Sequence, residues 1–214
     1  MSWRKVAEGL QIDIISSQLQ PREHLVEDDV MRRFSASRYA VRRALEELVA
    51  LGLAVRTENR GTRIRGYSSR EVAELYEMRE LLETGAARRI AMPPAKALVD
   101  ELVEIQKRHD RAMRAADVFE LYTANNEFHR TLFGACDNQT LVDAIVAYAL
   151  QVQPIRMRLI HDDKRKKQAS VEHWEMIEAL KEGDTESLVA VCGRHISLSK
   201  VLYLKQNAGL GIRA

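Results

Sequence analysis

Three histidines in the second half of the chain have the residue type and spacing to bind a transition metal. His129 lies four residues after Asn125, so both side chains project from one face of a helix. His173 and His195 lie on two later segments that we also expect to be helical. Imidazoles from several helices of a bundle form transition-metal sites. Lone helical histidines are more often core or surface residues satisfied by hydrogen bonds, so spacing alone leaves both interpretations open.

A second group of polar residues lies at the start of a predicted helix over residues 37–51, where it could contact DNA. The group consists of Ser37, Arg38, Tyr39, Arg42 and Arg43. A recognition helix enters the major groove with its N-terminal residues first, and arginines there bond to guanine or to phosphates. Taken alone, the pattern also fits an ordinary amphipathic surface helix, so the neighbouring elements decide between the two.

The elements around this helix give residues 1–67 a consistent plan. We predict helices over 6–19, 27–34 and 37–51, followed by strands over 54–57 and 62–65. The turn between the strands contains Arg60 and Gly61, which suits a hairpin. Three helices followed by a hairpin form a winged helix-turn-helix domain, with Arg60 and Gly61 in its wing.

Residues 68–214 are predicted to form a second, wholly helical domain. We predict six helices, over residues 69–92, 94–115, 117–135, 138–160, 170–183 and 184–205. Pro154 should bend the fourth helix, and the polar stretch 161–169 should be a loop. The expected fold class is therefore mainly α: a winged helix-turn-helix followed by an antiparallel six-helix bundle.

Composition limits the classes of protein to which the chain can belong. Hydrophobic residues make up 46% and charged residues 30% of the 214 residues, which suits a packed core and excludes a disordered tail. No apolar run approaches the roughly 18 residues of a membrane span, and we expect no membrane partner. Two cysteines and the absence of a signal-peptide pattern favour the cytoplasm. Residues 1–67 carry 12 basic against 9 acidic side chains, a mild excess that suits a polyanion partner.

The first domain resembles the winged helix-turn-helix of GntR-type bacterial transcription regulators. The resemblance is carried by the runs Leu25-Val26-Glu27, Ser35 to Leu45, Leu51-Gly52-Leu53 and Asn59-Arg60-Gly61-Thr62. It implies that Arg38 and Arg42 contact an operator and that Gly61 approaches the minor groove. Asp28 stands where relatives often carry arginine, so that phosphate contact is expected to be lost or rearranged. Tyr39-Ala40 replaces a common Thr-Pro pair, which changes the expected base preference.

The second domain resembles the ligand-binding FCD domain of the FadR subfamily, in its six-helix, VanR-like branch. The matching runs are Glu77 to Glu83, Phe128-His129, Asn138 to Leu141, Glu172-His173, Gly183-Asp184 and the late His195. The resemblance implies a divalent metal ligated by Asn125, His129, His173 and His195, with zinc or nickel the best suited ions. Relatives carry aspartate where Asn125 stands, so this site has less negative charge. The resemblance also implies that Arg79 points into the pocket and clamps an effector carboxylate; the residues alone equally allow Arg79 to pair with Glu77, Glu80 or Glu83 on a solvated helix face.

Together these features predict a ligand-responsive transcription regulator rather than an enzyme. We expect a homodimer on a palindromic, double-stranded operator, since twofold symmetry matches two half-sites. A small carboxylate would bind the bundle and alter operator affinity, with repression the usual arrangement in such families. The alternatives are a metal-dependent enzyme with a helical-bundle site, and a DNA-binding protein whose bundle and metal serve only stability.

Several other residues are assigned structural roles. We expect His109 to be solvated, His24 and His161 to lie at the surface, and the basic run 164–167 to be a solvated loop. Cys136 and Cys192 are predicted to be small core residues. Trp174 is expected either to pack in the bundle or to line its pocket.

Overall fold

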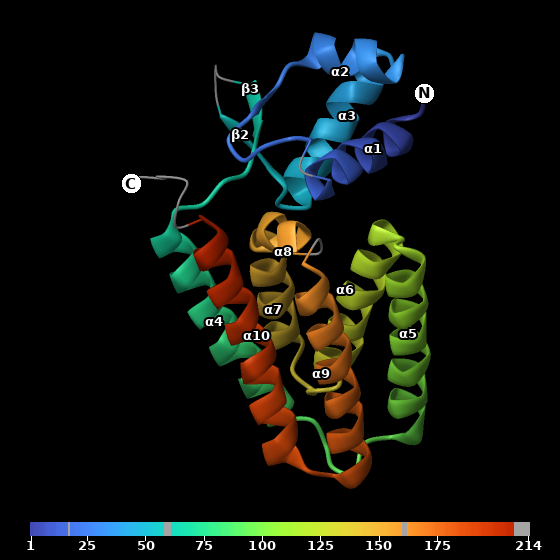
Figure 1. Ribbon diagram of the computed structural model, residues 1–214, viewed down its shortest axis with the longest axis vertical. Coiled ribbons are helices and arrows are strands. Elements are labelled where there is room, and N and C mark those ends of the chain that lie inside the picture. The colour runs from blue at the N-terminus through green and yellow to red at the C-terminus, as the bar shows by residue number, and fades with distance from the viewer. Residues whose placement is uncertain (17, 58–60, 160–161, 208–214) are drawn as a thin grey trace.

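The computed structural model describes residues 1–16, 18–57, 61–159 and 162–207, and it has a small N-terminal part above a long helical bundle (Figure 1). The N-terminal part consists of α1 (Trp3–Ile15), β1 (His24–Leu25), α2 (Glu27–Phe34), α3 (Arg38–Ala50), β2 (Ala54–Thr57) and β3 (Gly61–Ile64). The predicted winged helix-turn-helix plan and the mainly α fold class are confirmed.

Local signals in the sequence set the limits of α3, the predicted recognition helix. The Ser37 side chain accepts a hydrogen bond from the Ala40 N–H at 3.3 Å, which is an N-cap. Ser35 has a left-handed backbone (φ 46°) and closes the tight connection from α2. Gly52, with φ 72°, follows the end of α3 and allows the chain to turn into β2.

The sheet has a third strand that the sequence did not predict. Its order is β1-β3-β2, with both pairs antiparallel. β1 is two residues long and pairs His24 with Arg63 and Leu25 with Thr62. Two residues are too few to show the alternation by which strands are recognised, so only the folded neighbour reveals β1.

The bundle contains seven helices in the described residues, where six were predicted. They are α4 (Ser69–Ala87), α5 (Lys96–Ala115), α6 (Val118–Gly134), α7 (Gln139–Gln151), α8 (Gln153–Leu159), α9 (Asp163–Glu182) and α10 (Thr185–Asn207). The extra helix arises because the segment expected over 138–160 is divided at Val152. Pro154 has no N–H to donate to the carbonyl four residues earlier, so α7 cannot continue through it.

The loop predicted over 161–169 is wrong from Asp163 onward, because α9 begins there; His161 lies outside the described residues. The Asp162 side chain caps this helix by accepting a hydrogen bond from the Arg165 N–H at 2.9 Å. Asp163 adds negative charge in the first turn and pairs with Lys166 at 2.7 Å. A cap and an acidic first turn thus overcome the repulsion within the basic run.

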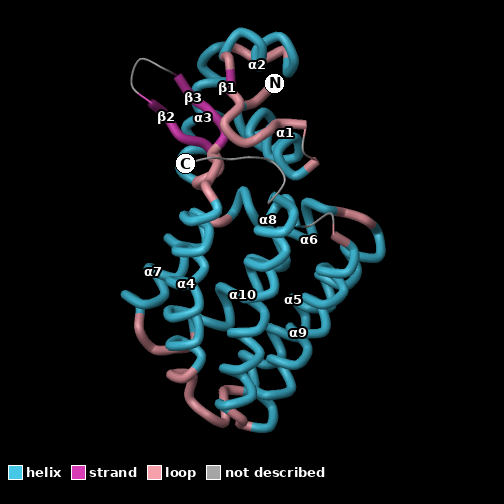
Figure 2. The backbone as a smooth tube through the Cα atoms, turned by 60° about the vertical axis from the view of Figure 1, so that its left-hand side comes forward, coloured by secondary structure: helices cyan, strands magenta, loops and turns pink. Residues whose placement is uncertain are grey.

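The short helix α8 lies between the bundle and the N-terminal part (Figures 1 and 2). It contacts α1 on one side and α7 and α10 on the other. Beside it, a Cβ placed on Gly52 would lie 2.5 Å from the Leu150 carbonyl oxygen of α7. The Tyr67 hydroxyl donates a hydrogen bond to the Gln151 carbonyl at 2.6 Å. The two parts of the chain therefore meet at the α7–α8 junction.

The N-terminal part and the bundle have separate hydrophobic cores. The core of the N-terminal part is built on fully buried residues of α1 and α3 such as Val6, Val41 and Leu48, and it also includes Tyr122 of α6. Cys136 and Cys192 are buried in the bundle core, as predicted. No helix of the described chain has the length and apolar character needed to cross a membrane.

We predict that Gly52→Ala destabilises the protein more than Gly183→Ala. Both glycines have a positive φ, 72° and 69°, so alanine costs about 1–2 kcal/mol of strain at either position. Only at Gly52 does the new Cβ also meet backbone, the Leu150 carbonyl, which should add about 1–3 kcal/mol. Urea unfolding followed by circular dichroism measures both, and equal losses would show that the α3–α7 contact is not tight.

Candidate ligand site and nucleic-acid interface

The structure brings His129, His173 and His195 together in the interior of the bundle. They come from α6, α9 and α10 and are 8%, 0% and 6% exposed. Their ring centroids lie 4.9–5.1 Å apart. One nitrogen from each ring can be chosen so that all three lie within 4.8 Å of one another. The three helices thus hold a compact set of imidazoles.

Burial lowers the pKa of all three rings well below the ordinary value, and neighbouring positive groups lower it further. The rings are therefore neutral near pH 7, which is the form that ligates metals. The Nδ1 of His195 lies 2.7 Å from a Glu172 carboxylate oxygen, and the Nδ1 of His173 lies 2.7 Å from the Gln106 amide oxygen. As neutral rings, both donate through Nδ1 and present Nε2 as a lone pair.

Two of the cluster's ring nitrogens are buried without a hydrogen-bond partner among the described residues. They are Nδ1 of His129 and Nε2 of His173. An unpartnered buried nitrogen is costly, and such atoms are rare in native interiors. The cluster therefore has three neutral rings, two of which carry an unpartnered nitrogen. Such a cluster suits a divalent ion that prefers imidazole ligands. Asn125, the expected fourth ligand, is half-buried on α6 and lines the same cavity as His195.

Glu172 and Arg165 both form hydrogen bonds with His195. Glu172 is fully buried and accepts a hydrogen bond from the Arg165 Nη1 at 2.9 Å. Arg165 also donates to the His195 carbonyl at 3.0 Å and to Ser199 Oγ at 3.1 Å. The prediction of a solvated run over 164–167 is therefore wrong for Arg165, which is 6% exposed. Helix formation turns Arg165 inward and places Lys166, with a side chain 18% exposed, at the wall of a neighbouring cavity, while Lys164 and Lys167 stay exposed.

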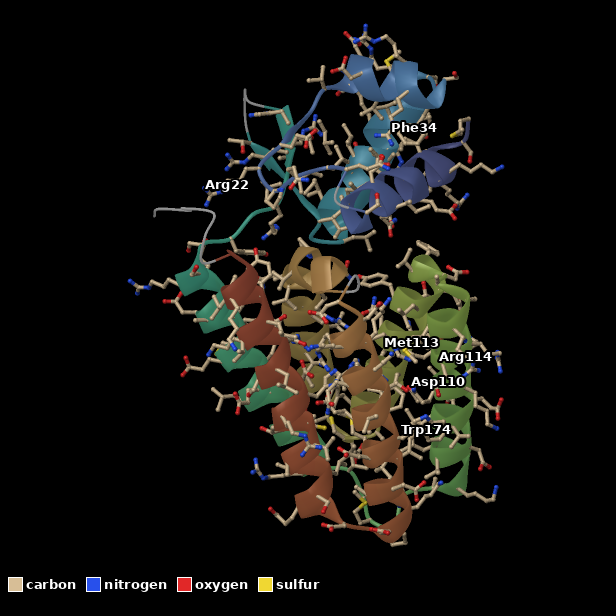
Figure 3. All side chains as sticks on the ribbon, in the orientation of Figure 1. Arg22, Phe34, Asp110, Met113, Arg114 and Trp174 are labelled. Carbon is tan, nitrogen blue, oxygen red and sulfur yellow. The ribbon has the colours of Figure 1, made fainter. Side chains whose placement is uncertain are left out.

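A second polar network fixes His173 from the side of α5. Gln106 Nε2 donates to Asp110 Oδ1 at 2.8 Å, and Ser170 Oγ donates to the same oxygen at 2.6 Å. Trp174 Nε1 donates to the other Asp110 oxygen at 3.0 Å, and Figure 3 shows the two residues facing each other from α9 and α5. Trp174 therefore packs in the bundle. Partners of this kind set the tautomer of a metal-binding histidine.

His109 is 2% exposed, so the prediction that it is solvated is wrong. It lies one helical turn from Gln106 and its ring is 5.2 Å from that of His173. Burial lowers its pKa, opposed by the carboxylate of Asp110. Its sequence neighbour Asp110 stays close, with a carboxylate oxygen 3.6 Å from the His109 Nδ1.

A cavity of about 70 Å³ opens beside the histidine cluster. Its walls include His195, Asn125, Tyr122, Arg156, Arg165 and Lys166. At roughly 10–15 Å³ per water, it has room for about five water molecules or a ligand of a few heavy atoms. Its walls are strongly cationic, so the cavity favours an anion.

The arginines around this cavity differ in how they are neutralised. Arg165 pairs with Glu172, and Arg79, on α4, pairs with Glu83 at 2.7 Å. Arg79 is 4% exposed and is not among the residues that line the cavity. Arg156, on α8, lines it and has no hydrogen bond or ion pair in the described part of the chain. Burial and the nearby Arg79 lower the Arg156 pKa, and the more distant Glu83 opposes them only in part.

The predicted DNA-contacting residues lie on one exposed stretch of α3. Tyr39 is 72% exposed, and the side chains of Arg38 and Arg42 are each 56% exposed. Arg38 pairs with Asp28 at 2.8 Å and Arg42 with Glu27 at 3.0 Å, both across to α2. Arg43 pairs with Glu46 along α3 at 2.9 Å.

In the wing, Gly61 begins β3 with φ 73° and open space around it. Arg60 lies outside the described residues. Ser37 serves as the N-cap of α3. The described residues that were predicted to contact DNA therefore lie on the N-terminal half of α3 and at the start of β3.

The sequence did not predict the residues that hydrogen-bond to the histidine cluster or lie beside it. The sequence points to Glu172 only through the family resemblance, and it gives no signal for Gln106 or Arg156. Gln106, Asp110 and the pair Ser170 and Trp174 have helical spacings of three and four, but nothing in the sequence says that α5 packs on α9. Arg156 sits two residues after Pro154, and only the break before α8 turns it toward the cavity.

Two family models match the chain. "Bacterial regulatory proteins, gntR family" matches residues 3–64, and "FCD domain" matches residues 74–198. The gluconate operon transcriptional repressor of Bacillus subtilis (strain 168) is 30% identical over 134 residues, which are 63% of this chain and 55% of that protein. The chain thus matches just over half the length of that relative. A probable D-xylose utilization operon transcriptional repressor of Paenarthrobacter nicotinovorans is 25% identical, and the alignment covers 96% of this chain and 90% of that protein.

Solved structures share the fold. A GntR transcriptional regulator from Rhodococcus sp. RHA1 superposes with a TM-score of 0.73 at 20% identity, covering 95% of this chain and 97% of that one. Escherichia coli McbR/YncC gives 0.74 at 17% identity with the same coverage. The relatives are transcription regulators and not enzymes, as the sequence predicted.

Proposed function

Because the chain belongs to the GntR family of bacterial regulatory proteins and carries an FCD domain, we propose that it is a transcriptional repressor controlled by a small carboxylate. The relatives at 30% and 25% identity are named as repressors of a gluconate operon and of a D-xylose utilization operon. The carboxylate would bind in the bundle and reduce the affinity of the N-terminal domain for its operator.

The observation that carries the ligand half of this proposal is the unpaired guanidinium of Arg156. A positive charge taken out of water is costly unless a counter-ion neutralises it. Arg156 lines a cavity that also contains Arg165 and Lys166, and no carboxylate of the described chain pairs with it. A ligand carboxylate supplies the missing charge and can bond both guanidinium N–H groups at once. Arg79, which already pairs with Glu83, is the weaker candidate for this contact.

The histidine cluster supports a divalent metal in the same site. His129, His173 and His195 would hold the ion, with Asn125 as a fourth, uncharged ligand. When bound, the ion supplies a Lewis-acidic contact for a carboxylate oxygen. Glu172 and Gln106 would hold the rings of His195 and His173 in the ligating orientation through their Nδ1 hydrogen bonds.

The DNA half of the proposal rests on α3. Arg38, Arg42 and Tyr39 are exposed together at the leading end of a capped helix within a winged helix-turn-helix. Such a helix enters the major groove N-terminus first. The chain would act as a homodimer, with two copies of α3 on a palindromic operator.

Helix α8 links the two halves. It carries Arg156 into the cavity and packs against α1 of the N-terminal domain. A ligand that draws Arg156 inward moves α8 relative to α1. The effect on DNA binding then equals the difference in ligand affinity between the two arrangements.

We expect Arg38→Ala and Arg42→Ala each to weaken operator binding by about 1–3 kcal/mol, since each removes a contact to base or phosphate. Gel shifts on a DNA fragment that the protein selects from random sequence provide the measurement. Arg89→Ala, an exposed arginine on the bundle, is the matched control and should bind as the unmodified protein does. Unchanged binding in both α3 variants would mean that α3 is not the recognition helix.

We expect purified protein to retain about one divalent ion per chain, and His173→Ala to lose it, because the fully buried ring is a central ligand. Metal content by inductively coupled plasma mass spectrometry, after purification without chelator, measures this. The control is His24→Ala, which changes an exposed histidine of β1. Equal metal content in the two variants would rule out the cluster as the binding site.

We expect Arg156→Gln to abolish the response to carboxylates while leaving operator binding in their absence intact. In the unmodified protein, an acid that binds should change operator affinity by roughly 5–150-fold, the usual range of coupling between two sites. Acetate, gluconate and phenylacetate are tested in the gel shift. Arg114→Gln, exposed on α5, is the control. A full response in Arg156→Gln would show that the anion binds elsewhere.

A further inference from the structure

A second pocket lies on the other side of Arg156, between α6, α7 and α8. Its volume is about 140 Å³, twice that of the cavity beside the histidines. Six apolar side chains form most of its wall: Phe133, Val142, Ile145, Val146, Ala149 and Leu150. The rest of the lining is polar and includes no carboxylate: Asn126, His129, Arg130, Gln153 and Arg156. The pocket is therefore suited to an apolar group and not to a hydrated one.

The apolar pocket is connected to the proposed effector site by shared residues. Arg156 lines both cavities, and His129 of the histidine cluster lines the apolar pocket. The Nδ1 of His129 is one of the buried nitrogens without a partner among the described residues. A ligand carboxylate held at Arg156 thus has cationic, polar walls on one side and hydrocarbon on the other.

We propose that the apolar pocket receives the hydrophobic part of the effector, which is then a monocarboxylic acid with an apolar body of about six carbons. This inference rests on the proposed function, because it takes Arg156 as the carboxylate contact. An apolar cavity of about 150 Å³ is large enough to hold benzene, and the pocket here is of that size. An aromatic or short alkyl acid matches both the volume and the charge.

The walls of the pocket distinguish such an acid from a sugar acid. Each methylene moved from water into an apolar site strengthens binding by about fourfold. A hydroxyl placed against Val142, Ile145 or Phe133 would lose its water hydrogen bonds and find no replacement, which weakens binding. The pocket therefore selects against gluconate, although a relative is named for a gluconate operon.

Titration calorimetry on the full-length protein tests the inference with acetate, gluconate and phenylacetate. The three acids carry the same single charge and differ in what they place beside Arg156. We expect phenylacetate to bind at least tenfold more tightly than either of the others, from the fourfold gain per buried carbon.

A pair of substitutions on α7 locates the site. Ala149→Phe fills the apolar pocket and should reduce phenylacetate affinity to that of acetate, while acetate binding stays within twofold. Ala147→Phe adds the same ring at an exposed position of the same helix that does not line the pocket, and it should leave all three affinities unchanged. Circular dichroism checks that both variants fold.

The outcomes separate this inference from the proposed function. If gluconate binds as tightly as phenylacetate or more tightly, and through Arg156, the apolar-acid inference is overturned while the effector site stands. If phenylacetate binds tightly but Ala149→Phe has no effect, the apolar pocket is not the site. If none of the acids binds at all, the carboxylate-controlled function is overturned as well.

Discussion

Charge balance inside the bundle is the constraint on which the rest of the site depends. Two arginines of the interior are neutralised by carboxylates of the same domain: Arg79 by Glu83 and Arg165 by Glu172. A buried pair survives desolvation only when its geometry and hydrogen bonds are good, and Arg165 meets this by also bonding His195 and Ser199. Arg156 has no such partner in the described chain. The cavity beside the histidines therefore contains one arginine that has no counter-ion among the described residues.

The same network that neutralises Arg165 also orients the histidine cluster. Glu172 accepts from both Arg165 and His195, so the carboxylate that balances the arginine also fixes the ring. On the opposite side, Gln106 fixes His173 through an amide, which adds no charge. The histidine cluster offers neutral imidazoles, and the neighbouring cavity offers the unpaired guanidinium of Arg156. A metal ion and an anion would therefore bind side by side to different groups.

The sequence predicted the elements well where local signals are strong, and poorly where only packing decides. The Ser37 cap, the acidic start of α2 and the hairpin around Gly61 are local features, and the winged helix-turn-helix followed from them. The convergence of His129, His173 and His195 was also foreseen, from helix spacing and from the family resemblance. The inward turn of Arg165, the burial of His109 and the role of Arg156 were not. Each depends on which helices pack together, and sequence spacing within one helix carries no such information.

Arginine and its counter-charges matter in both parts of the molecule, but the free energies involved differ. On α3, Arg38 and Arg42 are held by Asp28 and Glu27, but these pairs are exposed and worth only about 0–1 kcal/mol each. On the proposed recognition surface, DNA phosphates would displace such carboxylates readily, so Asp28 and Glu27 would mask the two arginines only weakly and reversibly. In the bundle, Arg156 is half-buried, so water screens its missing counter-charge less than it screens the exposed pairs on α3. Under the proposed function, a ligand that neutralises Arg156 would act through α8 on a surface whose own ion pairs are weak.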